Sequence, residues 1–123
     1  VYTPKMIAAE KLRAICQQRE DYPPMKYPRP RPRDFYDICA ILDAGVELPT
    51  PEWEELLARV FAAKKVPLSW LHEIGEHRGF HRQDWPSVRD AIGLETKSFD
   101  HYCDRVIRLC ESLESAGIED APS

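Results

Sequence analysis

The chain has 123 residues, of which 43% are hydrophobic and 31% are charged, and its formal net charge is −4. A chain of this length can form one domain around one hydrophobic core. It has no apolar run of the length that crosses a bilayer, and no signal peptide. The composition therefore excludes a membrane-spanning chain and is typical of a soluble globular protein, which we expect in the cytoplasm.

The charges are divided unevenly along the chain. Residues 1–33 contain eight Lys and Arg against three Asp and Glu, whereas residues 34–123 contain nine against eighteen. An excess of positive charge at one end suggests contact with an anion, although uneven decoration of the surface would give the same totals.

The cysteines show no spacing typical of a metal site or a redox pair. None belongs to a CxxC motif, and the two closest in sequence are seven residues apart. We expect all four to be small, buried, reduced thiols, with zinc binding as the minor alternative. They are Cys16, Cys39, Cys103 and Cys110.

The first predicted helix covers residues 4–19, with Thr3 as its cap and Pro4 in its first turn. Its unusual residue is Lys11, which lies within the apolar face. The residues three and four positions away on either side are all apolar: Ile7, Ala8, Ala14 and Ile15. Such a lysine either extends its ammonium to solvent along its aliphatic stem or is directed at a fixed anion.

Residues 20–33 form a basic connector with five prolines, which rule out a helix or a central strand and favour an extended, stiff conformation. The connector carries Lys26, Arg29, Arg31 and Arg33. It is a solvated linker, a proline-rich ligand for another domain, or a positive rim that binds phosphates or nucleic acid.

The second predicted helix covers residues 34–44, with Asp34 and Asp37 in its first turn. Carboxylates at this end of a helix are favoured by the helix dipole alone. Their spacing also places them on one face, where they can act together in a site.

The remaining segments also predict helices, at about residues 51–64, 68–78, 84–92 and 98–116, ended in three cases by Gly79, Gly93 and Gly117. No segment shows the alternation of a strand. We therefore predict an all-α fold, a compact bundle of five to six helices with the Pro/Arg-rich connector between the first two. We expect one domain over residues 1–117 and a frayed tail over 118–123.

The string HEIGEH at residues 72–77 does not have the spacing of a zinc protease motif, whose two histidines are four residues apart. Here they are five apart and point in different directions from a helix. We interpret the histidines of the chain as surface residues or hydrogen-bonded core residues.

Two strings together resemble a known family. The string YTPKMIAAEKLRAICQQR, followed by the basic connector and RDFYDICAIL, resembles the C-terminal half of the AbiEii/AbiGii toxin family. Proteins of that family are nucleotidyltransferase-like and act in bacterial toxin–antitoxin and phage-defence systems. The resemblance is strongest over residues 2–42.

The resemblance implies roles for three residues and for partners outside this chain. Lys11 would contact nucleotide phosphates, and Asp34 and Asp37 would be catalytic carboxylates. The full-length protein would use Mg²⁺ and an NTP, and would transfer a nucleotide to an acceptor, with RNA the expected one. A cognate antitoxin is a further expected partner.

The Gly-Ser turn and DxD pair that the family uses to bind magnesium do not occur in this sequence, which begins with Val1. We therefore interpret the chain as the C-terminal part of a longer protein, with no metal site or cofactor of its own and no activity in isolation. The alternative is a non-catalytic helical module that binds a protein or a nucleic acid.

Overall fold

The structure is a computed structural model that describes residues 2–93 and 95–113. Within these residues it contains helices and no strand, which confirms the all-α prediction. The helices are α1 (Pro4–Cys16), α2 (Pro32–Asp43), α3 (Pro51–Ala63), the 3₁₀ helix η1 (Leu68–His77), α4 (Arg78–Arg82), α5 (Trp85–Ile92) and α6 (Phe99–Glu111). No helix in these ranges has the length and apolar character that would let it span a membrane.

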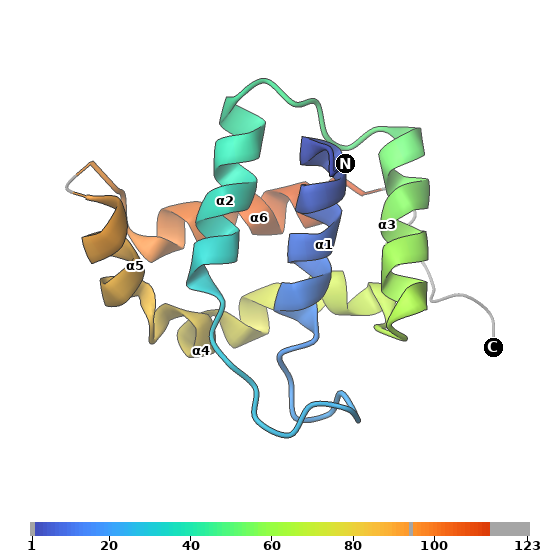
Figure 1. The fold of residues 1–123 in the computed structure, drawn as a ribbon, viewed down its shortest axis with the longest axis horizontal. Coiled ribbons are helices and arrows are strands. Elements are labelled where there is room, and N and C mark those ends of the chain that lie inside the picture. Colours follow the sequence, from blue (N-terminus) through green and yellow to red (C-terminus); the bar gives the residue numbers. More distant parts are fainter. Residues whose placement is uncertain (1, 94, 114–123) are drawn as a thin grey trace.

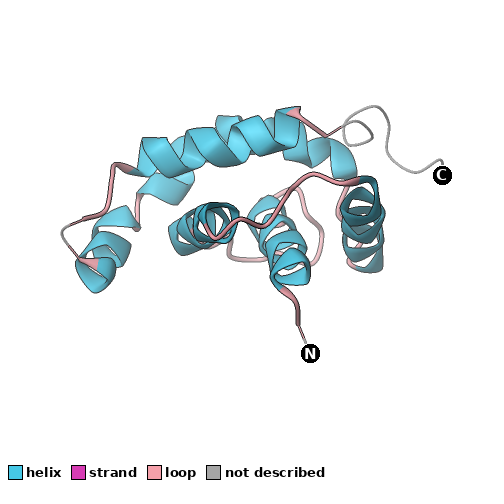
Figure 2. Ribbon diagram, turned by 90° about the horizontal axis from the view of Figure 1, so that it is seen from above, coloured by secondary structure: helices cyan, strands magenta, loops and turns pink. Residues whose placement is uncertain are grey.

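The helices form two layers. In Figure 1, α1 lies between α2 and α3 and contacts both, and α2 runs opposite to α1 and α3. The second layer consists of α6 and η1, which cross behind the first three helices (Figures 1 and 2). The core lies between the layers and includes Leu12, Phe35, Trp53 and Val106, each exposed by 1% or less.

Helix α1 begins as predicted but ends earlier. The Thr3 hydroxyl accepts a hydrogen bond from Met6 N, and Pro4 occupies the first turn. The helix ends at Cys16 and not at residue 19. The chain turns there because Gln18 is drawn inward, with 8% of its surface exposed, and accepts a hydrogen bond from the backbone of Arg29.

Helix α2 begins two residues earlier than predicted. Pro32 lies in its first turn, a position that proline favours because no backbone N–H is needed there. The connector between α1 and α2 is therefore residues 17–31, and Arg33 belongs to the helix.

The segment from 68 to 82 differs most from the prediction of a helix that ends at Gly79. Residues Leu68–His77 form a 3₁₀ helix, and α4 follows directly with Gly79 inside it. In a 3₁₀ helix, residues three apart lie on one face, and Leu71 and Ile74 are buried at that spacing. A Cβ at Gly75 would lie 3.4 Å from Ile107 of α6, so this glycine allows the close packing of η1 on α6.

The last two helices begin where they were predicted to begin, to within a residue. Helix α5 matches the predicted range to within a residue, and the Ser98 hydroxyl caps α6 by accepting a hydrogen bond from His101 N. Helix α6 ends at Glu111, whereas the prediction extended it to 116. Gly117 and the predicted tail at 118–123 lie outside the described residues.

The four cysteines are buried free thiols, as predicted. Burial raises the pKa of Cys39 and Cys103 to about 11 and that of Cys110 to about 12, and it raises the pKa of Cys16 well above the usual range. All four are therefore protonated at neutral pH and act as small apolar side chains of the core.

Candidate functional site

Lys11 and the two aspartates come together where α1 packs against α2. The Lys11 Nζ atom lies 3.0 Å from Asp34 Oδ1 and 3.1 Å from Asp37 Oδ2. The side chain of Lys11 is 25% exposed and that of Asp34 only 6%. The ammonium is thus directed at fixed anions, which decides between the two interpretations of a lysine in an apolar face.

Each aspartate also binds an arginine from the start of α2. Arg31 Nε donates a hydrogen bond of 2.6 Å to Asp34 Oδ2, and Arg33 Nε donates one of 3.0 Å to Asp37 Oδ1. Each carboxylate therefore joins Lys11 to one guanidinium. We call these five residues the charge cluster; with three cations and two carboxylates, its formal net charge is +1.

The charge cluster keeps Lys11 protonated. Burial lowers the pKa of Lys11, but hydrogen bonds and attraction from Asp34 and Asp37 outweigh that effect, so the pKa is raised. An ammonium has three N–H bonds. Two are directed at the aspartates, which leaves one for a further acceptor such as a phosphate oxygen.

Open cavities lie on both sides of the charge cluster. One, of about 270 Å³, is lined by Tyr2, Lys11, Arg13 and Arg31, among others. Another, of about 430 Å³, is lined by Arg29, Arg31, Arg33 and Asp84, among other residues. Because Arg31 lines both cavities, an anion can reach the cluster from either side.

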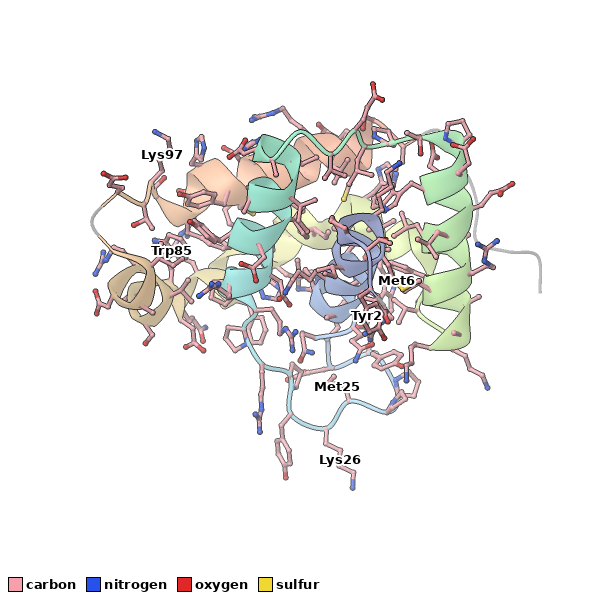
Figure 3. All side chains as sticks on the ribbon, turned by 45° about the horizontal axis from the view of Figure 1, so that its top comes forward. Tyr2, Met6, Met25, Lys26, Trp85 and Lys97 are labelled. Atoms are coloured by element: carbon pink, nitrogen blue, oxygen red, sulfur yellow. The ribbon has the colours of Figure 1, made fainter. Side chains whose placement is uncertain are left out.

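The four cations predicted to bind phosphates differ in their surroundings. Arg31 and Arg33 are paired within the charge cluster, whereas Lys26 and Arg29 are exposed and make no ion pair with the described residues. Figure 3 shows Lys26 extending away from the body of the protein. Arg31 and Arg33 therefore also pair with carboxylates of α2, and phosphate binding by the four cations stays a prediction.

Two buried polar side chains that the sequence did not single out fix the connector. Gln18 Oε1 accepts a hydrogen bond of 2.8 Å from Arg29 N, and His81 Nδ1 accepts one of 2.9 Å from Arg31 N. His81 is 1% exposed, and burial lowers its pKa to about 4. It is therefore the hydrogen-bonded core histidine that one interpretation allowed for. Nothing in the sequence linked it to Arg31, fifty positions earlier.

The described residues do not fit a magnesium site by themselves. No group of three or more His, Cys, Asp or Glu side chains within residues 2–93 and 95–113 is placed to hold a metal ion. The carboxylate oxygens of Asp34 and Asp37 already accept from Lys11, Arg31 and Arg33. A divalent cation would need ligands from another segment.

Comparison with known proteins identifies the family of this chain. The family model described as "Nucleotidyl transferase AbiEii toxin, Type IV TA system" matches residues 1–105. Neither the curated proteins nor the solved structures yielded a match. The matched range covers most of the chain, includes the whole charge cluster, and extends well beyond the strings at residues 2–42. The chain therefore belongs to the AbiEii nucleotidyltransferase toxin family.

Proposed function

We propose that this chain is the C-terminal helical domain of an AbiEii-type nucleotidyltransferase toxin, which transfers a nucleotide from an NTP to an RNA acceptor. The observation that carries the proposal is the fixed ammonium of Lys11, at 3.0 Å and 3.1 Å from two aspartates of another helix. The family match supports the general activity.

The charge cluster suits the handling of phosphates. In nucleotidyl transfer an acceptor hydroxyl attacks the α-phosphorus of the NTP, and pyrophosphate leaves. Positive groups stabilise the negative charge on the phosphate oxygens during this step. Lys11 offers its remaining N–H as a point charge, and Arg31 adds a guanidinium between the two cavities.

In this proposal Asp34 positions Lys11 and Arg31, and Asp37 positions Lys11 and Arg33. Both act as catalytic carboxylates once the rest of the protein is present. The N-terminal half would supply the remaining ligands for Mg²⁺, which in phosphoryl transfer neutralises charge and aligns the phosphates. The isolated chain is incomplete as an enzyme.

The partners follow from the same proposal. Lys26 and Arg29 are exposed and unpaired with the described residues, so they are available to guide a polyanionic acceptor such as RNA. A cognate antitoxin is the partner that the family description suggests. The same two cations also favour the alternative of a non-catalytic nucleic-acid-binding module.

The test uses the full-length protein and radiolabelled NTPs with total RNA as acceptor. Lys11→Met keeps the apolar stem and removes the charge, so we expect transfer to fall by a factor of about 100 or more. Nucleotide transfer by Asp34→Asn should fall by a comparable factor. Lys5→Met is the matched control, because Lys5 is an exposed lysine of the same helix, and it should retain wild-type activity.

The outcome that contradicts the proposal is undiminished transfer by Lys11→Met when its circular dichroism spectrum and melting temperature match those of the Lys5→Met control. A full-length protein that binds RNA but transfers no nucleotide would support the non-catalytic module instead.

A further inference from the structure

A third cavity lies beside the connector, and none of its lining residues belongs to the charge cluster. Its volume is about 550 Å³, within the range of ligand sites, about 300–1,000 Å³. Neither Lys11, Asp34 nor Asp37 lines it. Its lining includes Gln18, Arg19, Asp21, Pro28, His77 and Phe80. The cavity thus lies between the end of α1, the connector and the junction of η1 with α4.

Two charged groups of this cavity, Arg19 and Asp21, already have partners. Arg19 donates hydrogen bonds of 2.8 and 2.6 Å to Asp21 and one of 2.9 Å to Glu73, and its guanidinium lies 3.9 Å from the ring centre of Trp70. The exposed carboxylate of Glu20 also lines the cavity. This arrangement disfavours a phosphate here and suits a neutral polar ligand.

The other lining groups suit a flat heterocycle. His77 and Phe80 are three residues apart at the junction of η1 and α4, so both reach the same cavity. The Phe80 ring packs edge-on against buried His81, with 5.2 Å between centroids, which fixes its orientation. Aromatic side chains of this kind stack on nucleobases.

Gln18 adds directional hydrogen bonding. Its carboxamide is held in place because Oε1 accepts from Arg29 N, and the residue is 8% exposed. The two N–H bonds of its amide nitrogen remain as the donors that a ligand could use. Carbonyl and ring-nitrogen acceptors are the groups on a nucleobase edge that such a donor recognises.

The surroundings of the cavity suit a polynucleotide chain. Pro28 lines the cavity, and its neighbours are Tyr27, which is 82% exposed, and Arg29. Arg29 also lines the 430 Å³ cavity together with Arg31 of the charge cluster. A polynucleotide with one base in this cavity would therefore place its next phosphate near Arg29 and continue toward the charge cluster.

We propose that this cavity binds one unpaired nucleobase of a single-stranded polynucleotide, with Arg29 holding the next phosphate. The inference rests on the proposed function in that it places the acceptor strand of the same reaction. It is independent of the Lys11 site in its residues, so the two can fail separately.

The experiment measures binding of the 123-residue chain to three labelled oligonucleotides of equal length by fluorescence anisotropy. One is oligoadenylate RNA, one is the DNA equivalent, and one is an abasic strand with the same phosphates. We expect the RNA to bind about tenfold more tightly than the abasic strand, which is the effect of stacking one base. The DNA arm shows whether the ribose hydroxyls contribute.

The readout for variants is the ratio of affinities for the base-bearing and abasic strands, because this ratio cancels changes in overall charge. Phe80→Leu, which removes the aromatic ring and keeps an apolar side chain, should bring the ratio near one. Gln18→Glu keeps the acceptor for Arg29 N and removes the amide donors, and it should lower the ratio as well. The double variant Lys26→Ser/Arg29→Ser should weaken both strands, reduce the salt dependence and leave the ratio unchanged.

Equal affinity of the wild type for the base-bearing and abasic strands would overturn the inference, and so would an unchanged ratio in both Phe80→Leu and Gln18→Glu. Melting temperatures show whether Phe80→Leu and Gln18→Glu are folded. If only one of them is folded, the ratio for that variant decides the test. Binding of tripolyphosphate, compared between wild type and Lys11→Met, reports on the charge cluster alone. Loss of that binding together with a wild-type nucleobase ratio would separate the two sites.

Discussion

At Lys11 two carboxylates from a neighbouring helix offset the cost of taking an ammonium out of water. The apolar residues around Lys11 were enough to predict that the ammonium needs a partner, and the spacing of Asp34 and Asp37 was enough to nominate that partner. The pairing of Arg31 and Arg33 with the same carboxylates was missed, although the spacings of three and four residues are those of helical ion pairs. It depends on α2 beginning at Pro32, two residues earlier than predicted.

The buried imidazole of His81 predicts how stability depends on pH. Its pKa is about 4 in the folded protein and about 6.5 when unfolded, because burial disfavours the charged form and neighbouring His77 adds repulsion. Asp34 acts in the opposite direction and Arg31 in the same direction as His77, and the net shift is downward. The unfolded chain therefore takes up the proton first, and stability falls as the pH drops from 6.5 toward 4.

We expect the free energy of unfolding to decrease by about 2 kcal/mol between about pH 7.5 and about pH 5, measured by urea denaturation. His81→Asn offers an oxygen near the Nδ1 position and does not titrate, so it should lose most of this dependence. His101→Gln, at a partly exposed position of α6, should keep it. A wild-type slope in His81→Asn would assign the effect to another group.

At the scale of elements, the connector shows what composition can and cannot predict. Five prolines correctly indicated an irregular segment between the first two helices. They gave no sign of the side chains that brace it. Gln18 and His81 bind its backbone, and the Tyr22 hydroxyl donates a hydrogen bond of 2.7 Å to Lys64 O at the end of α3. Such long-range partners depend on tertiary packing.

The brace at Tyr22 can be tested without disturbing the charge cluster. Tyr22 is 6% exposed, and Tyr22→Phe removes only its hydroxyl, which leaves the carbonyl of Lys64 without that partner. We expect a loss of about 1 kcal/mol in the free energy of unfolding and faster amide exchange at Arg29 and Arg31. Tyr27→Phe is the matched control, since Tyr27 is exposed, and it should be neutral. Unchanged exchange in Tyr22→Phe would show that the other braces suffice.

The 3₁₀ helix η1 illustrates a second limit of local patterns. A glycine near the end of an apolar segment commonly ends a helix, and Gly79 was assigned that role. In the structure, burial of Leu71 and Ile74 three residues apart and the tight contact of Gly75 with α6 favour the narrower helix. Both causes lie in the packing against another helix, so the segment itself does not reveal them.

At the scale of the whole molecule, α1 and α2 lie side by side in one layer (Figure 1). The charge cluster lies where these two helices meet. The all-α class and most of the helices followed from periodicity and caps. The family followed from two strings, and the family model then extended the match to residue 105.

If the active site is divided between two halves, as proposed, the isolated 123-residue chain should not label RNA from any NTP in the presence of magnesium. The measurement is incorporation of radiolabel into total RNA, with the full-length protein as positive control. Robust, magnesium-dependent labelling by the isolated chain would show that the domain is catalytically complete, and would contradict our division of the active site between two halves.

The hydrogen bond between Gln18 and Arg29 closes the connector at its base, eleven residues apart, and so separates it into two mechanical parts. The segment from Arg29 to Pro32 contains Arg31 of the charge cluster. The outer turn with Lys26 and Tyr27 has no residue in the cluster. Changes in length or sequence within that outer turn would leave the geometry around Lys11 intact. If the proposed function holds, different outer turns on the same charge cluster would change the choice of acceptor and leave the residues around Lys11 in place.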